Sequence, residues 1–489
     1  MLENTLQGAL IGVTAVSTLT LALPSTSFVR YALYPLPALL VMRALLWPPT
    51  EGLAKETYLL GLLMTDTSFK VFDYLYLQGY DAPATFFQVD RVGRTITKVH
   101  EYPQDTLGRI KWALSLVTSH RGIGWNIQVP VQKIRYPCST IAYVSESMVS
   151  VLSIYLGLYT CGSLCDYMVQ VLRKEVDSPS PWVYELFKNE LFQMVVAFMG
   201  IFAMVSNSVL VYNFIRMICV TSGIGGSWGK IESWPNMFGD FEDAWSIRNV
   251  WGRAWHQNLR RCLTAPGEKA SYIIFGDPSK LGRIPRLIRR YFLVFSAFGV
   301  SGLLHSLAVY YGSKTDVMPY EDSTPLPMRP GWYVTGYFFY IQPVAITLED
   351  FICWATGAST ESKSVKATRV RWFIGMVYTL AWFTWGTAVL WIHPQLASLG
   401  YQRTSDAGLG YVHILVSTSE AASILPLNPW PVVVKTVSPI FWDLYGYLKS
   451  SGLGAHLYLY VYTTLEILGS SSGFNVLRSA NSVVENKYP

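Results

Sequence analysis

The sequence has few charged residues and few cysteines for its length. Asp, Glu, Lys and Arg make up 14% of its 489 residues, whereas globular proteins average about 25%. Its six cysteines show neither zinc-binding spacing nor a disulfide framework. No Asn-x-Ser/Thr site marks a glycosylated loop. These deficits argue against a soluble protein and against a disulfide-stapled scaffold, and we expect no metal site.

Hydrophobic residues instead make up 51% of the chain and gather in long runs. A run of about 20 apolar residues can cross a bilayer as a helix. The candidate spans are residues 6–23, 31–47, 58–77, 144–164, 191–218, 291–311, 332–353, 372–392 and 457–468, with a weaker one at 433–447. We expect an all-α polytopic membrane protein with about eight to ten transmembrane helices. They would form a single integral-membrane domain, residues 1–489.

Two of these runs have an alternative interpretation. The first resembles a signal peptide, but residues 1–5 carry Glu3 and no basic residue, which favours a membrane anchor. The run at 58–77 contains three ionisable residues, Asp66, Lys70 and Asp73. This run is therefore either a span or a buried or interfacial helix.

The net charge of +6 is spread unevenly along the chain. The basic excess lies in three stretches, 81–135, 248–290 and 356–371. The connections at 313–331 and 393–430 are slightly acidic. Two predicted spans separate each basic stretch from the next, so all three fall on one side, and the positive-inside rule places that side in the cytosol. We expect residues 81–138 and 222–290 to be large cytosolic or interfacial loops.

One histidine lies deep within a predicted span. His305 is 14 residues into the run at 291–311, roughly 21 Å from its cytosolic start at the helical rise. An ionisable side chain there is costly and indicates a functional site by default. Small residues before it, Gly299, Ser301 and Gly302, permit close approach of another helix or a ligand. The alternative is a structural histidine that hydrogen-bonds between helices.

A second polar segment, residues 251–261, reads Trp-Gly-Arg-Ala-Trp-His-Gln-Asn-Leu-Arg-Arg. If this segment is helical, Arg253, His256 and Arg260 lie on one face. Such a face suits a phosphate-bearing ligand, because guanidinium groups bind phosphate oxygens in pairs. The alternative is an amphipathic interfacial helix with tryptophans at the headgroups and arginines at the membrane surface.

Together these segments resemble the membrane-bound O-acyltransferase superfamily, in its wax-synthase-like branch. That branch carries a Trp-Gly-Arg-x-Trp-His-Gln element, matched by 251–257, about 50 residues before an intramembrane Ser-Gly-x-x-His, matched by 301–305. Residues 121–126 and 338–350 also resemble fungal members of the branch. The order and spacing of the four elements make the resemblance specific.

The resemblance implies helices around a chamber, with acyl-CoA entering from the cytosol and a hydroxyl acceptor from the bilayer or lumen. It implies that His305 is the catalytic base. His256 stands where many relatives have Asn or Asp, so its role, either as an oxyanion donor or in orienting the thioester, is open. The expected donor-binding residues are Arg253, Arg260, Arg261, Trp255 and Gln257.

Further residues complete the predicted site or its surroundings. Ser301 is expected to line the chamber with Gln342 and Glu349, which share a helix face. For Gln342 and Glu349 the alternative is pairing with other intramembrane polar groups. For Arg121 and Trp125 we favour a role in loop structure over direct catalysis.

The expected reaction is direct acetyl transfer from acetyl-CoA to a hydroxyl of a lipophilic terpenoid or meroterpenoid secondary metabolite. We expect no permanently bound cofactor, no nucleic-acid partner, and a location in the endoplasmic reticulum membrane. The runner-up is a long-chain wax-ester or sterol-ester synthase. A transporter, with His305 as proton relay, is the rival class, and the absence of an internal repeat counts against it. A non-catalytic scaffold is the third alternative.

Overall fold

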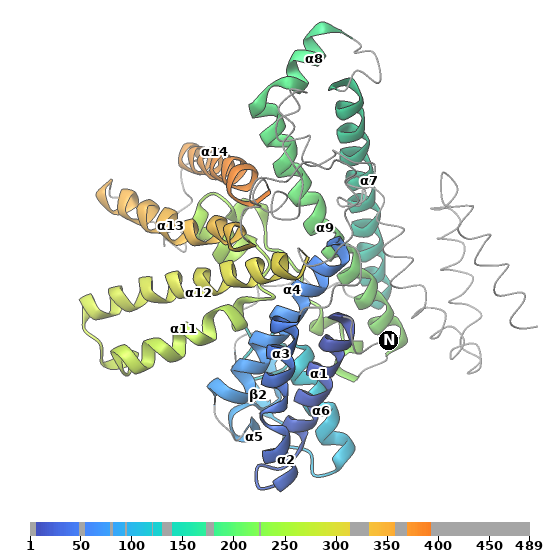
Figure 1. The fold of residues 1–489 in the computed structure, drawn as a ribbon, viewed down its shortest axis with the longest axis vertical. Helices are drawn as coiled ribbons and strands as arrows, with labels where there is room; N and C mark the ends of the chain where they lie inside the picture. Colours follow the sequence, from blue (N-terminus) through green and yellow to red (C-terminus); the bar gives the residue numbers. More distant parts are fainter. Residues whose placement is uncertain are drawn as a thin grey trace, which may run out of the picture. The chain divides into compact units, whose positions relative to one another are not determined.

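The computed structural model describes residues 6–47, 54–78, 82–92, 95–119, 121–129, 139–172, 180–223, 226–312, 332–356 and 369–392. These residues all belong to one compact unit, Met1–Leu427. They are almost entirely helical (Figure 1), which confirms the all-α expectation. Their strands are one antiparallel hairpin, β1 (Val89–Val92) with β2 (Thr95–Val99). The predicted runs at 433–447 and 457–468 lie outside the described residues.

Helices occupy every predicted apolar run within the described residues, and further helices lie between the runs. In chain order they are α1 (Leu6–Ala22), α2 (Phe28–Leu33), α3 (Leu36–Leu46), α4 (Ala54–Val71), α5 (Ala82–Thr85), α6 (Thr106–Thr118), α7 (Thr140–Leu172), α8 (Pro181–Lys188), α9 (Glu190–Ser222), α10 (Ile247–Asn249), α11 (Arg260–Phe275), α12 (Arg283–Gly312), α13 (Tyr337–Ala355) and α14 (Arg369–Gly386). Stretches long and apolar enough to cross a membrane are Phe28–Leu46, Thr140–Gly157, Arg283–Tyr311 and Trp372–Trp391. Leu6–Ala22 and Ser208–Ser222 are shorter apolar helices.

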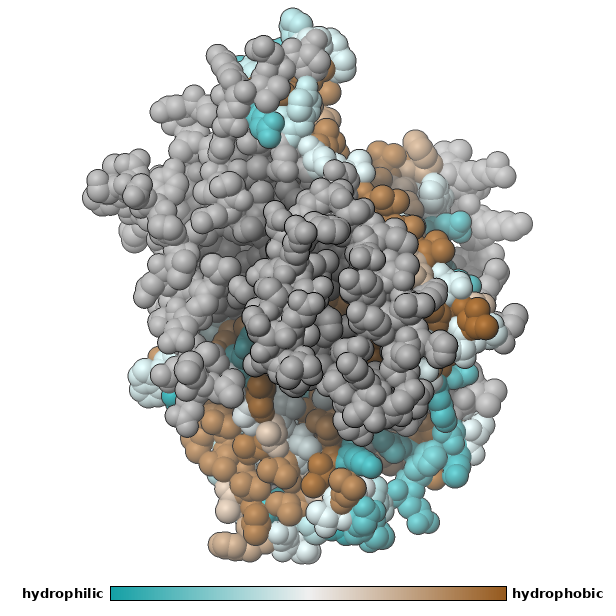
Figure 2. Space-filling model, turned by 90° about the vertical axis from the view of Figure 1, so that its right-hand side faces the viewer, coloured by the Kyte–Doolittle hydropathy of each residue, from teal (hydrophilic) through white to brown (hydrophobic). Residues whose placement is uncertain are grey.

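Large apolar side chains point outward on several of these helices. Phe28, Ile141 and Trp354 have exposed fractions of 82%, 80% and 78%. On the face shown in Figure 2, hydrophobic and hydrophilic residues gather in separate regions of the lower part. A water-soluble surface does not leave so many large apolar groups exposed together, whereas a lipid-facing surface requires them.

Helix α12 packs against α4, α11 and α13. Two glycines allow this close packing. A Cβ on Gly61 of α4 would lie 3.1 Å from the Cα of Ala308, and one on Gly267 of α11 would lie 2.5 Å from Ser296 Oγ. Small residues permit such contacts between membrane helices. Helix α12, which carries His305, is thus held from three sides.

The run at 58–77 forms a buried helix rather than one of the candidate spans. It comprises α4 and a π-helical turn, Phe72–Leu77. Lys70 Nζ lies 2.6 Å from Asp66 Oδ2, with both side chains 5% exposed. Asp73, 1% exposed, is paired with Arg261 of α11. Buried charges are tolerated only when paired, so the polar residues of this run serve to attach it to the rest of the protein.

Candidate active site

His305 lies on α12 against an aromatic cluster. Its ring stacks on Phe339 of α13, with centroids 3.9 Å apart, and meets Trp391 edge to face at 5.7 Å. Its Nδ1 lies 2.8 Å from the backbone oxygen of Ser301. Because a carbonyl oxygen only accepts hydrogen bonds, Nδ1 of the neutral ring carries the hydrogen and Nε2 keeps a lone pair. The ring is therefore held in the tautomer that accepts a proton at Nε2.

Glycines on two sides let α13 approach α12 next to this histidine. A Cβ on Gly302 would lie 2.1 Å from Tyr340 Cε1, and one on Gly336 would lie 2.7 Å from Tyr340 Cε2. The tyrosine ring is thus flanked by both glycines. Gly299 has open space instead, with nothing within 4 Å of the place that a Cβ would take. The small residues before His305 therefore admit a helix, at Gly302.

We expect the substitution Gly302→Ala to destabilise the protein and reduce its activity. The Tyr340 ring also lies close to Gly336 and has little room to yield there, so we expect α13 to shift, and Phe339 with it. Overpacking of this kind costs roughly 1–3 kcal/mol. Thermal unfolding in detergent and acyl-transfer assays in membranes measure the two effects. Gly299→Ala is the matched control and should leave stability unchanged or higher; an equally stable Gly302→Ala would contradict the packing described here.

The segment at 251–261 is not a continuous helix, so the condition under which Arg253, His256 and Arg260 would share one helix face is not met. Helix α10 passes into a π-helical turn, Val250–Ala254, and Trp255 is then extended, with ψ at 152°. The Gln257 amide donates to the backbone oxygens of Trp251 and Trp255, at 3.2 and 2.8 Å. This side chain satisfies carbonyls that a helix end leaves unpaired, so the break is stable.

His256 joins the same aromatic cluster from the opposite end. Its ring lies 5.3 Å from that of Trp255 and 5.6 Å from that of Phe238. Trp255 contacts Trp251 at 5.6 Å, and Trp251 contacts Phe339, on which His305 stacks, at 6.2 Å. A continuous series of rings therefore connects the two predicted catalytic histidines.

Gln342 holds two tryptophans of this cluster in place. Its Oε1 accepts from Trp251 Nε1 at 3.1 Å and from Trp382 Nε1 at 3.2 Å, while its Nε2 donates to the Phe338 carbonyl at 2.8 Å. The side chain is fully buried. Because both indoles can only donate, the amide oxygen must face them. These contacts favour the alternative in which Gln342 pairs with other polar groups inside the membrane over a place in the chamber lining.

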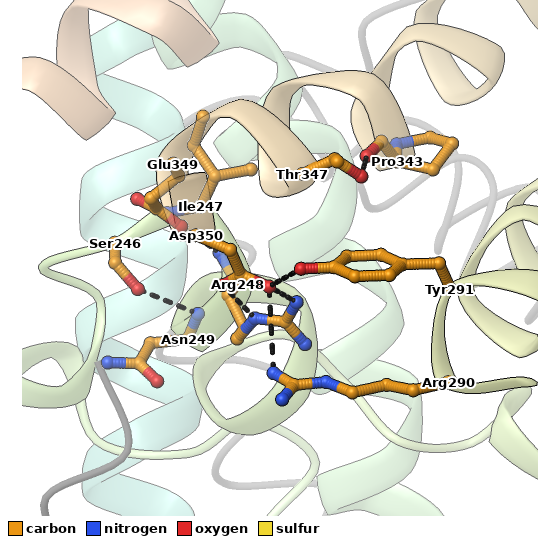
Figure 3. A network of polar contacts seen from close by, with 10 residues as sticks. All are labelled: Ser246, Ile247, Arg248, Asn249, Arg290, Tyr291, Pro343, Thr347, Glu349 and Asp350. Atoms are coloured by element: carbon orange, nitrogen blue, oxygen red, sulfur yellow. Dashed lines mark hydrogen bonds and ion pairs between the residues drawn. The ribbon is translucent and has the colours of Figure 1, made fainter. Parts of the chain in front are cut away.

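Glu349 and Asp350 of α13 attach α10 to α12 (Figure 3). The Glu349 carboxylate accepts from the backbone nitrogens of Ile247 and Arg248, each at 3.0 Å. Asp350 pairs with Arg248, whose Nε lies 2.9 Å from Oδ1, and accepts from the Tyr291 hydroxyl at 2.9 Å. Glu349 is 8% exposed and both its oxygens are used. Its contacts likewise favour pairing over lining a chamber.

His256 and His305 both lie in the part of the chain that matches a known protein family. Residues 234–321 match the profile of the membrane bound O-acyl transferase family. An acetyltransferase of Arthrobotrys oligospora is 87% identical over 484 residues, which cover 99% of this chain and 100% of that relative. The chain belongs to the membrane-bound O-acyltransferase family.

Other relatives of this O-acyltransferase are more distant. An O-mevalon transferase of Aspergillus niger is 27% identical over 412 residues, covering 83% of this chain and 88% of the relative. An O-mevalon transferase of Penicillium terrestre is 28% identical over 393 residues, covering 78% and 83%. No solved structure matches the chain. The resemblance inferred from the sequence is thus confirmed at the level of the family, while the roles of individual residues stay predictions.

The predicted donor-binding arginines of this O-acyltransferase differ in their surroundings. Arg261 donates from Nε and Nη2 to both carboxylate oxygens of Asp73, at 2.8 and 3.2 Å. Arg260 is exposed and donates to Gln257 Oε1 at 2.9 Å. Arg253 lies 3.8 Å from Asp243, with side chains 44% and 36% exposed. Arg253 and Arg260 are therefore accessible to a phosphate, whereas Arg261 is committed to a buried carboxylate.

Arg121 and Trp125 stabilise a loop, as favoured from the sequence. Arg121 donates to the backbone oxygens of Pro235 and Asn236 at 2.8 and 2.7 Å. Trp125 is 1% exposed, and it follows Gly124, whose φ of 78° favours glycine. These contacts join the loop at 121–129 to the start of the family match.

Two residues that the sequence analysis did not single out have unusual surroundings in this O-acyltransferase. Arg216 is 7% exposed and lies over the rings of Tyr143 and Tyr212, at 5.0 and 5.9 Å. Its Nε has no hydrogen-bond partner in the described part of the chain. Trp391, beside His305, has a buried Nε1 that likewise has no hydrogen-bond partner among the described residues. An arginine within an apolar run was the available signal for the first; no sequence signal distinguishes Trp391 from other tryptophans.

A covalent nucleophile motif is present in the sequence but lacks its usual structural context. Residues 225–229 read Gly-Gly-Ser-Trp-Gly and match the Gly-x-Ser-x-Gly spacing. That motif acts as a nucleophile elbow between a strand and a helix, but here Gly226–Gly229 is a 3-10 turn after α9.

Burial and the nearby Asp66 carboxylate raise the pKa of the Cys262 thiol well above its ordinary value. The Cys262 thiol therefore lacks the surroundings of an activated nucleophile. No group of His, Cys, Asp or Glu among the described residues is placed to hold a metal.

Proposed function

We propose that this O-acyltransferase moves an acetyl group from acetyl-CoA to a hydroxyl of a lipophilic terpenoid or meroterpenoid secondary metabolite, in the endoplasmic reticulum membrane. The names acetyltransferase and O-mevalon transferase, given to its fungal relatives, support transfer of this kind. Acetyl-CoA is a co-substrate, and no permanently bound cofactor takes part.

The observation that carries this proposal is the hydrogen bond from His305 Nδ1 to the Ser301 carbonyl. It leaves Nε2 as the proton acceptor, which is the state a general base requires. The same bond stabilises the imidazolium once a proton arrives, because Nδ1–H continues to donate to the carbonyl. A structural histidine between helices would instead be expected to use both ring nitrogens in hydrogen bonds.

In the proposed reaction, His305 Nε2 takes the proton of the acceptor hydroxyl as its oxygen attacks the thioester carbon. The carbonyl electron pair moves to oxygen, and the tetrahedral intermediate then collapses. The carbon–sulfur bond breaks, and the departing thiolate of CoA takes the proton from His305. Ester and free CoA are the products, and the histidine returns to its neutral form without an acyl-enzyme.

Acetyl-CoA would approach along the expected cytosolic loop, residues 222–290, in the part that leads into α11. Arg253 and Arg260 are the proposed partners of its phosphates, with Trp255 and Gln257 supporting the segment. Arg216 joins them as a candidate, because its buried Nε has no hydrogen-bond partner among the described residues and such a guanidinium would gain from an anionic ligand. His256 is proposed to orient the thioester from this side of the aromatic series.

Incubating membranes that contain the protein with acetyl-CoA or palmitoyl-CoA, each against a panel of terpenoid and fatty alcohols, tests the proposal. Acetylation of a terpenoid alcohol is the expected result. Preference for palmitoyl-CoA and a fatty alcohol or sterol would favour the ester-synthase alternative. Uptake of a solute without any thioester-dependent product would favour a transporter and overturn the proposal.

A further inference from the structure

A buried hydrogen-bond donor without a partner lies next to the predicted base. Trp391, in the π-helical turn Thr387–Ile392, is 4% exposed, and its indole Nε1 makes no hydrogen bond within the described part of the chain. Four other described indoles do donate, those of Trp234, Trp251, Trp372 and Trp382. Burying a donor without an acceptor is destabilising, and such groups in folded proteins call for an explanation, of which a catalytic role is one.

The ring of Trp391 is held firmly against the base. It stacks on Phe338 with centroids 5.0 Å apart and meets Phe339 edge to face at 5.3 Å. His305 is 5.7 Å from it, with the two rings nearly perpendicular, at 86°. This packing leaves the indole little freedom to turn away from His305.

We propose that the Trp391 indole N–H donates to the carbonyl oxygen of the acyl donor as that oxygen becomes negatively charged. This inference rests on the proposed function. The thioester carbon must lie close to His305, because the hydroxyl that attacks this carbon gives its proton to Nε2. A donor in contact with His305 is then within reach of the carbonyl oxygen. Preorganised donors at a developing oxyanion act most strongly where water is excluded.

The step balances without a further reactant. As the acceptor oxygen bonds to the carbonyl carbon, the π electron pair moves to the carbonyl oxygen, which accepts the Trp391 hydrogen bond. The indole keeps its proton throughout. When the carbon–sulfur bond breaks, the electron pair returns to form the ester carbonyl and the hydrogen bond weakens.

Trp391 is better placed for this role than His256. Among the described ring contacts, His256 is connected to His305 through the rings of Trp255, Trp251 and Phe339. Trp391 contacts the His305 ring itself. His256 thus contacts the acyl donor away from the reacting carbon, whereas the Trp391 indole contacts the carbonyl group of that carbon.

The pair of substitutions Trp391→Phe and Trp382→Phe tests the proposal. Both remove the same volume and an indole N–H, but Trp382 donates to Gln342 in the resting protein, whereas Trp391 makes no such bond within the described residues. We expect Trp391→Phe to lower kcat by about 10²–10³-fold with little change in either KM, because the bond forms only in the transition state. Compared with Trp391→Phe, Trp382→Phe should lower the thermal midpoint more and kcat less.

A kcat for Trp391→Phe no lower than that of Trp382→Phe would overturn the proposal, as would a larger loss of thermal stability in Trp391→Phe. If that variant fails to accumulate, 3-benzothienylalanine at position 391 keeps the ring shape and replaces N–H by sulfur, and full activity of that protein would overturn the proposal. Wild type and His305→Ala are assayed beside them. Acyl transfer that depends on His305 but not on Trp391 leaves the proposed function intact and removes this inference alone.

Discussion

His305→Ala is expected to abolish acyl transfer, with kcat lowered at least 10²–10⁴-fold, the range that general-base catalysis typically contributes. The substitution removes the nitrogen that receives the hydroxyl proton, and the described rings that contact His305, those of Phe339 and Trp391, offer no base to replace it. Product formation from labelled acetyl-CoA in membranes, normalised to the amount of folded protein, measures the effect.

His100→Ala is the matched control for this substitution. His100 is a histidine in the loop after β2, with its Nε2 3.1 Å from Asp90 Oδ2 and both side chains well exposed. Its removal should leave acyl transfer per folded protein unchanged, because surface ion pairs contribute little to stability. Activity of folded His305→Ala equal to that of His100→Ala would show that His305 is structural.

Breaking the ion pair between Asp73 and Arg261 is expected to have the largest effect on stability. Asp73 is 1% exposed and is held by two hydrogen bonds from one guanidinium. Removing one partner of such a pair leaves a buried charge uncompensated and costs about 3–5 kcal/mol. Asp73→Asn and Arg261→Met should therefore each lower the thermal midpoint in detergent strongly.

The double substitution separates a structural role of Arg261 from donor binding. With Asp73→Asn and Arg261→Met combined, neither charge of the pair is left uncompensated, so stability should recover relative to either single variant. If Arg261 serves the fold alone, the double variant also keeps the KM for acetyl-CoA. A raised KM in a stable double variant would restore Arg261 as a phosphate ligand.

The sequence was sufficient to predict the helices and the family because both depend on local patterns. Apolar runs of the right length gave helices at every predicted run within the described residues. The element at 251–257 and His305 lie within the residues that match the family profile. Ionisable residues such as Asp66 and Lys70 in a run otherwise apolar favoured the alternative of a buried or interfacial helix, and the structure shows these two paired.

The contacts between distant segments were beyond the sequence. Helical spacing placed Gln342 and Glu349 on one face, but it could not identify the partners, two indoles and two backbone amides, that use their polar atoms. The break at Trp255 depends on the Gln257 side chain bonding backward to the backbone. An indole that donates to no described residue, as at Trp391, becomes visible only in the structure.

One histidine, His305, is proposed to promote direct transfer between two bound substrates. Initial rates measured with acetyl-CoA and the acceptor alcohol both varied test it most directly, together with a search for label on the protein after incubation with labelled acetyl-CoA alone. Direct transfer predicts double-reciprocal lines that intersect and no labelled protein. Parallel lines with an acetyl group retained on the protein are the signature of a covalent acyl-enzyme and would contradict the account.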